Sequence, residues 1–180
     1  MAGRLIGVVG PSGVGKDSVM VALARAEPRL GLVRRVITRP AEAGGEEFEG
    51  VSGVEFAARA EAGAFVLHWQ AHGLRYGVPA TIREELAAGR DLLVNLSRAV
   101  LREAAETFPG FLVLSLTASK EVLAQRLAGR GRETTEDIAK RLSRADVALP
   151  DGLPVVTLSN DGSLADTVAR ARAALYPVSA

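Results

Sequence analysis

In the stretch Gly10-Pro11-Ser12-Gly13-Val14-Gly15-Lys16-Asp17, three glycines precede a lysine at the spacing of a loop that holds nucleotide phosphates. The apolar run 5–9 comes directly before it, and residues 16–26 repeat apolar side chains at the period of a helix. A glycine-rich turn between a strand and a helix directs backbone N–H groups at an anion, and the helix N-terminus adds positive potential. We therefore predict that Gly10 to Lys16, called the phosphate loop below, binds the phosphates of ATP.

The position after Lys16 is unusual, because it normally carries a serine or threonine whose hydroxyl contacts Mg²⁺. Here it is Asp17, followed by Ser18. A carboxylate is a suitable ligand for Mg²⁺, although an acidic residue in the first turn of a helix is also stabilised by the helix dipole. We predict Asp17 as the Mg²⁺ ligand with Ser18 as the alternative, and we count both among the ATP-binding residues.

The pattern of a buried strand followed by a helix returns three times along the chain. The expected pairs are 92–96 with 98–107, 111–116 with 121–127, and 155–158 with 164–175. Continuous apolar strands that alternate with helices are typical of a parallel sheet covered on both faces. We predict a single α/β domain over residues 1–180, with the three-layer fold of the P-loop NTPases and a parallel central sheet.

Two segments interrupt this pattern. Residues 36–89 contain a Gly- and Glu-rich loop, a short helix at 54–61 opened by the capping pair Ser52 and Glu55, and a β segment at 65–78. We expect this insertion to bind the acceptor. Residues 128–136 are rich in arginine and glycine, and we expect them to act as a mobile lid.

The composition excludes several classes of function. A net charge of +1 argues against a general nucleic-acid or membrane-surface binder. With no cysteine, the chain has neither a disulfide framework nor a thiolate metal site. No apolar run reaches the roughly 20 residues that span a bilayer, and the N-terminal residues lack the pattern of a signal peptide. We expect a cytoplasmic protein with a small-molecule substrate, and the sequence leaves the oligomeric state open, a homodimer included.

Two polar residues mark the end of the predicted strand 92–96. Asn95 and Arg98 lie at the carboxyl end of that strand, which is where parallel sheets bind ligands. We count them as candidate substrate-binding residues. The alternative is structural, since Ser97 and its neighbours would also serve to cap the following helix.

Beyond the phosphate loop, the order of motifs resembles the guanylate kinase family over nearly the whole chain. The motifs are Thr38-Arg39-Pro40, the stretch from Trp69 to Gly77, the lid sequence Arg126-Leu-Ala-Gly-Arg130-Gly-Arg132-Glu133, and Asn160-Asp161. The resemblance implies that Arg39 and Tyr76 hold the phosphate of the acceptor and that Asn160 contacts the adenine of ATP. It also implies that the catalytic residues are Lys16 and three arginines that close over the transferring phosphoryl group, Arg126, Arg130 and Arg141.

The chain departs from that family where the guanine base is read. The base-recognising glutamate and serine fall on Leu67 and Val78, which offer no hydrogen bond to a purine. The chain is more similar to a narrower family, the ribose 1,5-bisphosphate phosphokinases, which convert ATP and ribose 1,5-bisphosphate to 5-phospho-α-D-ribose 1-diphosphate in phosphonate metabolism. Motifs of that resemblance include Asp17 in the phosphate loop, Val94-Asn-Leu-Ser-Arg98 and Asn160-Asp-Gly-Ser163.

The resemblance leads us to expect a kinase that uses ATP and Mg²⁺ and acts on a sugar bisphosphate. Because its acceptor is already a phosphate with an anionic oxygen, no general base is needed, and we assign His68 and His72 to the structure or the surface. Two other functions stay open: a nucleoside monophosphate kinase of altered base specificity, and a non-catalytic guanylate-kinase-like binding module. Intact Lys16 and the lid arginines disfavour the binding module.

Overall fold

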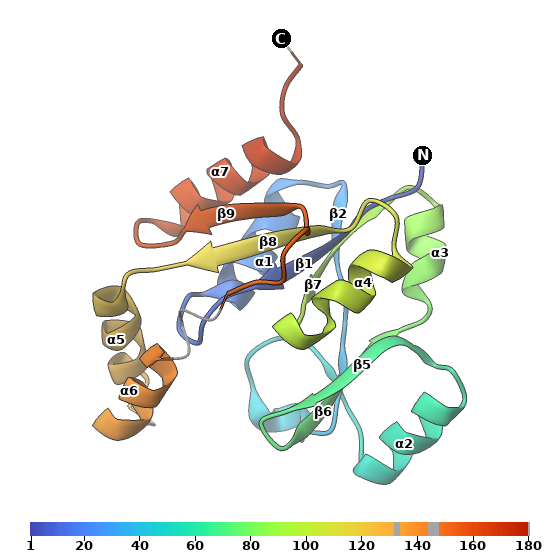
Figure 1. Ribbon diagram of the computed structural model, residues 1–180, viewed down its shortest axis with the longest axis horizontal. Helices are drawn as coiled ribbons and strands as arrows, with labels where there is room; N and C mark the ends of the chain where they lie inside the picture. The colour runs from blue at the N-terminus through green and yellow to red at the C-terminus, as the bar shows by residue number, and fades with distance from the viewer. Residues whose placement is uncertain (132–133, 144–147, 180) are drawn as a thin grey trace.

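The computed structural model describes residues 1–131, 134–143 and 148–179. Arg132 and Glu133 of the predicted lid, together with Ala180, therefore lie outside the described residues. Five parallel strands form the central sheet in the order β2-β7-β1-β8-β9 (Figure 1). They are β1 (Leu5–Val9), β2 (Leu30–Leu32), β7 (Asp91–Asn95), β8 (Leu112–Thr117) and β9 (Val155–Ser159). The parallel sheet predicted from the sequence is confirmed.

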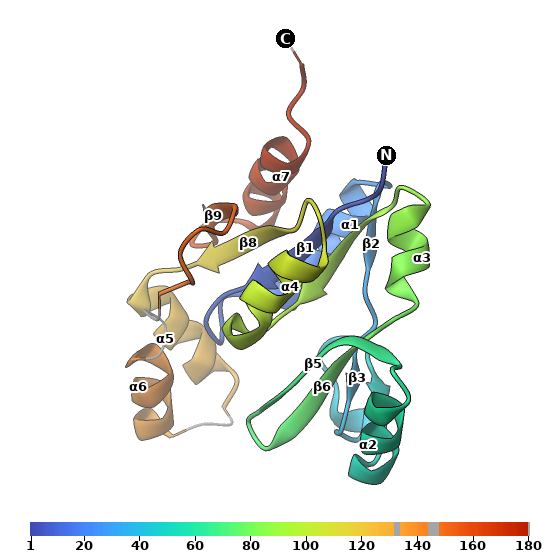
Figure 2. The same ribbon diagram turned by 45° about the vertical axis from the view of Figure 1, so that its right-hand side comes forward.

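Helices cover both faces of this sheet because successive side chains of a strand point to opposite faces. On one face, Ile6 and Val8 of β1 belong to a core with α1 (Lys16–Ala26), α5 (Lys120–Gly129) and α7 (Leu164–Leu175). On the other face, Leu5 and Val9 belong to a core with α3 (Ile82–Ala87) and α4 (Leu101–Thr107). The predicted three-layer fold is confirmed, and Figure 2 shows α1 and α4 on opposite sides of β1.

The predicted insertion forms a second, smaller sheet with the order β4-β3-β6-β5. Its elements are β3 (Val36–Ile37), a 3-10 turn η1 (Ala41–Ala43), β4 (Glu49–Gly50), α2 (Gly53–Glu61), β5 (Phe65–Ala71) and β6 (Leu74–Pro79). Ser52 caps α2 as predicted by accepting the N–H of Glu55. The carboxylate of Glu55 accepts a hydrogen bond from Arg59 at 2.8 Å.

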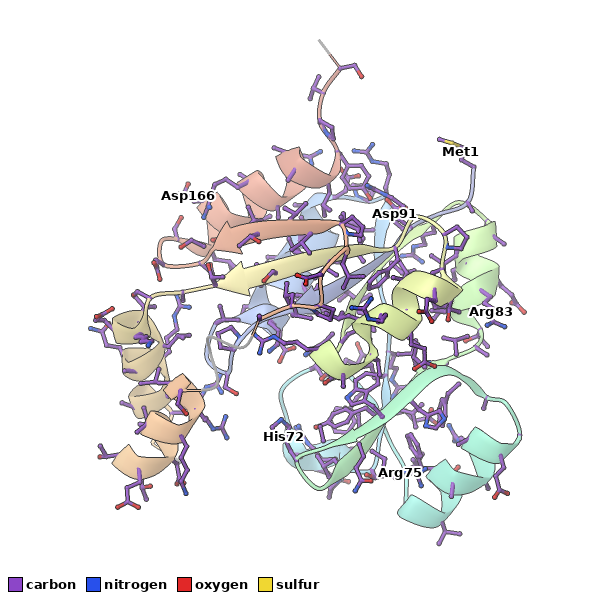
Figure 3. All side chains as sticks on the ribbon, in the orientation of Figure 1. Met1, His72, Arg75, Arg83, Asp91 and Asp166 are labelled. Atoms are coloured by element: carbon purple, nitrogen blue, oxygen red, sulfur yellow. The ribbon has the colours of Figure 1, made fainter. Side chains whose placement is uncertain are left out.

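The β segment predicted at 65–78 is a hairpin of β5 and β6. His72 and Gly73 form its turn with φ angles of 53° and 72°, which is the left-handed geometry that two-residue hairpin turns require. Figure 3 labels His72 at this tip. The hairpin carries side chains of the smaller sheet toward the carboxyl ends of β1 and β7.

The segment after β8 differs in detail from the prediction. The predicted lid 128–136 begins within α5 and ends within α6 (Thr135–Ser143). The helix predicted at 98–107 begins as a 3-10 turn, η2 (Arg98–Val100), capped by Ser97, before α4 starts. In the described part of the chain, no helix is long and apolar enough to span a bilayer.

A buried polar cluster holds the opposite end of the sheet together. Asp91, which begins β7, accepts hydrogen bonds from the backbone N–H of Arg4 and the hydroxyl of Tyr176, each at 2.6 Å. The guanidinium of Arg4 also pairs with this carboxylate at 2.9 Å. The carboxylate is therefore satisfied by the protein itself, and the cluster fastens the end of α7 to the sheet.

Candidate active site

The phosphate loop joins β1 to α1 in the conformation that its glycines predict. Gly13 and Gly15 have φ angles of 86° and 93°, which side chains other than hydrogen rarely allow. At Gly10 the constraint is space, because an added Cβ would lie 2.7 Å from the backbone oxygen of Leu116. The ammonium of Lys16 donates to the carbonyl of Gly10 at 2.6 Å, which holds the lysine over the loop.

The surroundings of Lys16 destabilise its positive charge. Burial is the largest cause that lowers its pKa to about 8, and repulsion from Arg35 and Arg98 adds to it, while Asp17 acts in the opposite direction. A bound polyphosphate would stabilise the charged form, because it places negative charge next to the ammonium. The electrostatics of the loop therefore favour an anion.

Arg126 and Asn160 stabilise the phosphate loop by hydrogen bonds to its backbone. Arg126 donates to the carbonyls of Val14 at 3.1 Å and Asn160 at 2.6 Å. The side chain of Asn160 is 5% exposed and donates to the carbonyl of Val14 at 2.7 Å. It also accepts the hydroxyl hydrogen of Thr167 at 2.6 Å. Sequence reasoning missed Thr167, whose only signal was a polar residue on the buried face of an amphipathic helix.

A pocket of about 570 Å³ opens beside the phosphate loop, at the carboxyl ends of β1 and β7. This is the place where parallel sheets bind ligands. The structure brings many of the predicted site residues to its wall: Gly10, Pro11, Ser12, Lys16, Tyr76, Asn95, Arg98 and Arg141. Residues from the main sheet, the hairpin and α6 thus meet around one cavity.

Other predicted residues lie elsewhere in this structure. Arg39 has its guanidinium 4.9 Å from the ring centroid of Phe48 and donates to the carbonyl of Gly44. Arg130 is exposed at the end of α5. Neither arginine is among the residues that the structure describes as lining the pocket, and the same holds for Arg126 and Asn160.

Asp17 and Ser18 are exposed on the first turn of α1. Within the described ranges, no group of three or more His, Asp or Glu side chains could hold a metal ion. A single carboxylate suits Mg²⁺ only when phosphate oxygens and water complete its coordination, as in nucleotide complexes. The residues present therefore fit a metal that arrives with ATP.

Sequence reasoning also missed Arg35, which lies between β2 and β3 in the wall of the pocket. Its side chain forms a two-pronged ion pair with Glu46, with Nε at 3.0 Å from Oε2, and donates from Nη1 to the carbonyl of Asn95 at 3.1 Å. Its guanidinium carbon is 5.0 Å from the ring centroid of Tyr76. Tyr76 in turn stacks on Trp69, with the centroids 5.4 Å apart.

The charged side chains that line the pocket are all cationic. Lys16, Arg35, Arg98 and Arg141 line it, and no carboxylate does so among the described residues. The Nε of Arg98 is buried and has no hydrogen-bond partner in the part of the chain that the structure describes. Four cations around one cavity, with an unused donor among them, suit a ligand with several negative charges.

The two positions to which the sequence resemblance assigns the guanine contacts lie in the apolar core. Leu67 and Val78 are paired across β5 and β6 and are 1% and 0% exposed. They pack in the same core as Leu92 and Val94 of β7. These two positions offer no polar contact to a purine, as the sequence predicts.

Comparisons with known proteins show the family of this chain. A family model described as guanylate kinase matches residues 2–161. The chain is 55% identical over 172 residues to a protein of Ruegeria sp. (strain TM1040) named ribose 1,5-bisphosphate phosphokinase PhnN, covering 95% of this chain and 90% of that one. It is 52% identical to a protein of the same name from Pseudomonas fluorescens (strain SBW25), covering 94% and 93%.

Among solved structures, the guanylate kinase of Anaplasma phagocytophilum is similar, with a TM-score of 0.66 and 18% sequence identity over 97% of this chain and 84% of that one. At this level of identity the similarity shows the fold alone. It agrees with the parallel sheet and the helices on both faces described above.

Proposed function

We propose that this chain, which belongs to the guanylate kinase family, is a ribose 1,5-bisphosphate phosphokinase that transfers the γ-phosphoryl group of ATP to the 1-phosphate of its acceptor. The products are ADP and 5-phospho-α-D-ribose 1-diphosphate. The observation that carries the proposal is the pocket beside the phosphate loop, with four cationic side chains and no carboxylate among its described lining residues. The names of the two relatives support the same acceptor.

The chemistry requires alignment and charge neutralisation. An oxygen of the 1-phosphate attacks the γ-phosphorus of ATP, and the bond from that phosphorus to the β-bridging oxygen breaks. The attacking oxygen is already anionic, so the reaction needs no general base. The N–H groups of the phosphate loop and the ammonium of Lys16 hold the phosphates of ATP. Asp17 or Ser18 would hold Mg²⁺, which supplies positive charge to the phosphate oxygens.

The arginines divide into two sets by their positions. Arg98 and Arg141 line the pocket, and we assign them to the acceptor phosphates and the transferring group, with Tyr76 and Asn95 beside them. Arg130 lies outside the pocket in this structure, so its catalytic role requires α5 and α6 to approach the site when both substrates are bound.

Three predicted roles also depend on residues outside the pocket wall. We assign Arg126 to the support of the phosphate loop, since its guanidinium contacts that loop, and its predicted contact with the transferring group requires a rearrangement. Asn160 has the same support role, and its predicted contact with adenine remains part of the proposal. Arg39 would likewise exchange its contact with the Gly44 carbonyl for an acceptor phosphate.

A comparison of acceptors tests the function. Purified protein is incubated with ATP, Mg²⁺ and either ribose 1,5-bisphosphate or GMP, and phosphorus NMR detects a newly formed diphosphate. We expect product with ribose 1,5-bisphosphate and none with GMP, because Leu67 and Val78 leave the base edge without partners. Lys16→Ala serves as the inactive control. Product with GMP alone would show instead a nucleoside monophosphate kinase.

A further inference from the structure

The ion pair between Arg35 and Glu46 is a costly feature of the pocket wall. Arg35 is 5% exposed, and removing a guanidinium and a carboxylate from water costs free energy that their attraction often only just recovers. The pair joins the two sheets, because Glu46 belongs to the loop before β4 and Arg35 also contacts the carbonyl of Asn95 at the end of β7. A contact that served only to join the two sheets would not need a charged side chain such as Arg35 facing a cavity.

The hydrogen bonds of Arg35 leave donors for a ligand. A guanidinium has five N–H donors, and the structure shows three bonds from it, two to the carboxylate and one to the carbonyl. Arg35 shares the pocket with Lys16 and with Arg98, whose Nε has no partner among the described residues. The unused donors of Arg35 and Arg98 therefore belong to one cavity.

The ion pair with Glu46 fixes the orientation of the Arg35 guanidinium. A carboxylate that binds Nε and one terminal nitrogen of a guanidinium holds the planar group in a single orientation. The ring of Tyr76 lies 5.0 Å from the guanidinium carbon and limits its movement from a second side. With this orientation fixed, the N–H groups of Nη1 and Nη2 that neither Glu46 nor Asn95 accepts can donate to phosphate oxygens.

We propose that Arg35 binds a phosphate group of the acceptor and helps to determine acceptor specificity, and that Glu46 is a positioning residue for its guanidinium. This inference rests on the proposed function, because the ligand is the sugar bisphosphate of that reaction. It adds two residues that the motifs did not indicate, and it gives a role to the ion pair that holds Arg35 in the pocket wall.

The test compares Arg35→Met with Arg34→Met. Arg34 precedes Arg35, is exposed, and loses the same charge on substitution. We expect Arg35→Met to raise the KM for ribose 1,5-bisphosphate by about 10- to 100-fold, the factor that a charge-assisted hydrogen bond is worth. The KM for ATP should stay within about twofold of wild type, and Arg34→Met should change neither constant.

Two milder variants keep the test valid if Arg35→Met does not fold. Arg35→Lys keeps the positive charge but loses the planar guanidinium. Glu46→Gln keeps the shape of the side chain but loses the negative charge that orients this guanidinium. We expect both to raise the KM for the acceptor more than the KM for ATP. With ADP present to occupy the phosphate loop, inorganic phosphate should raise the Tm of wild type and Arg34→Met more than that of any Arg35 variant.

The outcomes separate this inference from the proposed function. If wild type does not phosphorylate ribose 1,5-bisphosphate, the proposed function fails whatever the variants do. If wild type is active and the folded Arg35 variants keep an acceptor KM within about twofold of wild type, the inference is wrong. An equal rise in both KM values would show that Arg35 acts through the phosphate loop, and this also overturns the inference.

Discussion

Replacing Lys16 by methionine should stabilise the protein without nucleotide while it abolishes phosphoryl transfer. The pKa of Lys16 falls from its ordinary value of 10.5 to about 8, mainly through burial. A tenfold change in an equilibrium is worth about 1.4 kcal/mol, so holding this lysine charged costs the folded state about 3 kcal/mol at neutral pH. Methionine also loses the hydrogen bond to the carbonyl of Gly10, worth about 1 kcal/mol. The expected net gain is about 2 kcal/mol.

The size of this effect depends on pH. Because the pKa of Lys16 is lower in the folded than in the unfolded protein, the unfolded state binds more protons between about 8 and 10.5. The stability of wild type therefore rises through this window, and the advantage of Lys16→Met disappears as the lysine becomes neutral in both states.

Thermal denaturation followed by circular dichroism, without nucleotide, measures this difference. At neutral pH the Tm of Lys16→Met should exceed that of wild type by about 4 to 8 °C, and the gap should close toward pH 10. Lys140→Met, an exposed substitution on α6, should leave the Tm nearly unchanged at every pH. A Tm for Lys16→Met at or below that of wild type at neutral pH, or a gap that does not vary with pH, would refute the reasoning.

Three further predictions follow from contacts of single residues. Gly10→Ala places a Cβ 2.7 Å from a backbone oxygen of β8, so we expect the KM for ATP to rise at least tenfold, about 1.4 kcal/mol in binding. Gly53→Ala is the control, because its Cβ would lie in open space, and it should leave the KM for ATP unchanged. Thr167→Val leaves the buried Oδ1 of Asn160 without its hydroxyl partner, and urea denaturation should show a loss of about 1 to 3 kcal/mol. Hydrogen bonds from Arg29 lower the pKa of the Glu27 carboxyl to about 2. The stabilisation that this carboxylate gives to the folded state is complete above its ordinary pKa of 4.5 and is lost as the pH falls toward 2. The stabilities of wild type and Glu27→Gln should therefore converge near pH 2.

The parts of the fold that could be predicted are those that long apolar patterns encode. The predicted bounds of the strand 5–9 and the helices 16–26 and 164–175 coincide with those of β1, α1 and α7. The strand β2 and the helix α3 were not predicted, because three and six residues are too few to establish a period. The structure also divides the predicted helix 98–107 into a 3-10 turn and α4, a boundary that propensities do not resolve.

The phosphate loop was determined by the sequence itself. Its geometry arises within seven consecutive residues, where glycines allow positive φ angles and close backbone contacts, so the pattern specifies the conformation. The loss of polar groups at Leu67 and Val78 was likewise visible in the sequence.

Only the tertiary structure decided which charges meet in the pocket. Arg35, Glu46 and Asn95 come from the loop before β3, the loop before β4 and the end of β7, and no pattern in the chain relates them. Conversely, Arg39, Arg126 and Arg130 belong to recognisable motifs, yet the fold directs them away from the pocket wall that the structure describes. An arginine can bind a phosphate, an acidic side chain or a carbonyl, and only the folding of distant segments determines which partner it faces.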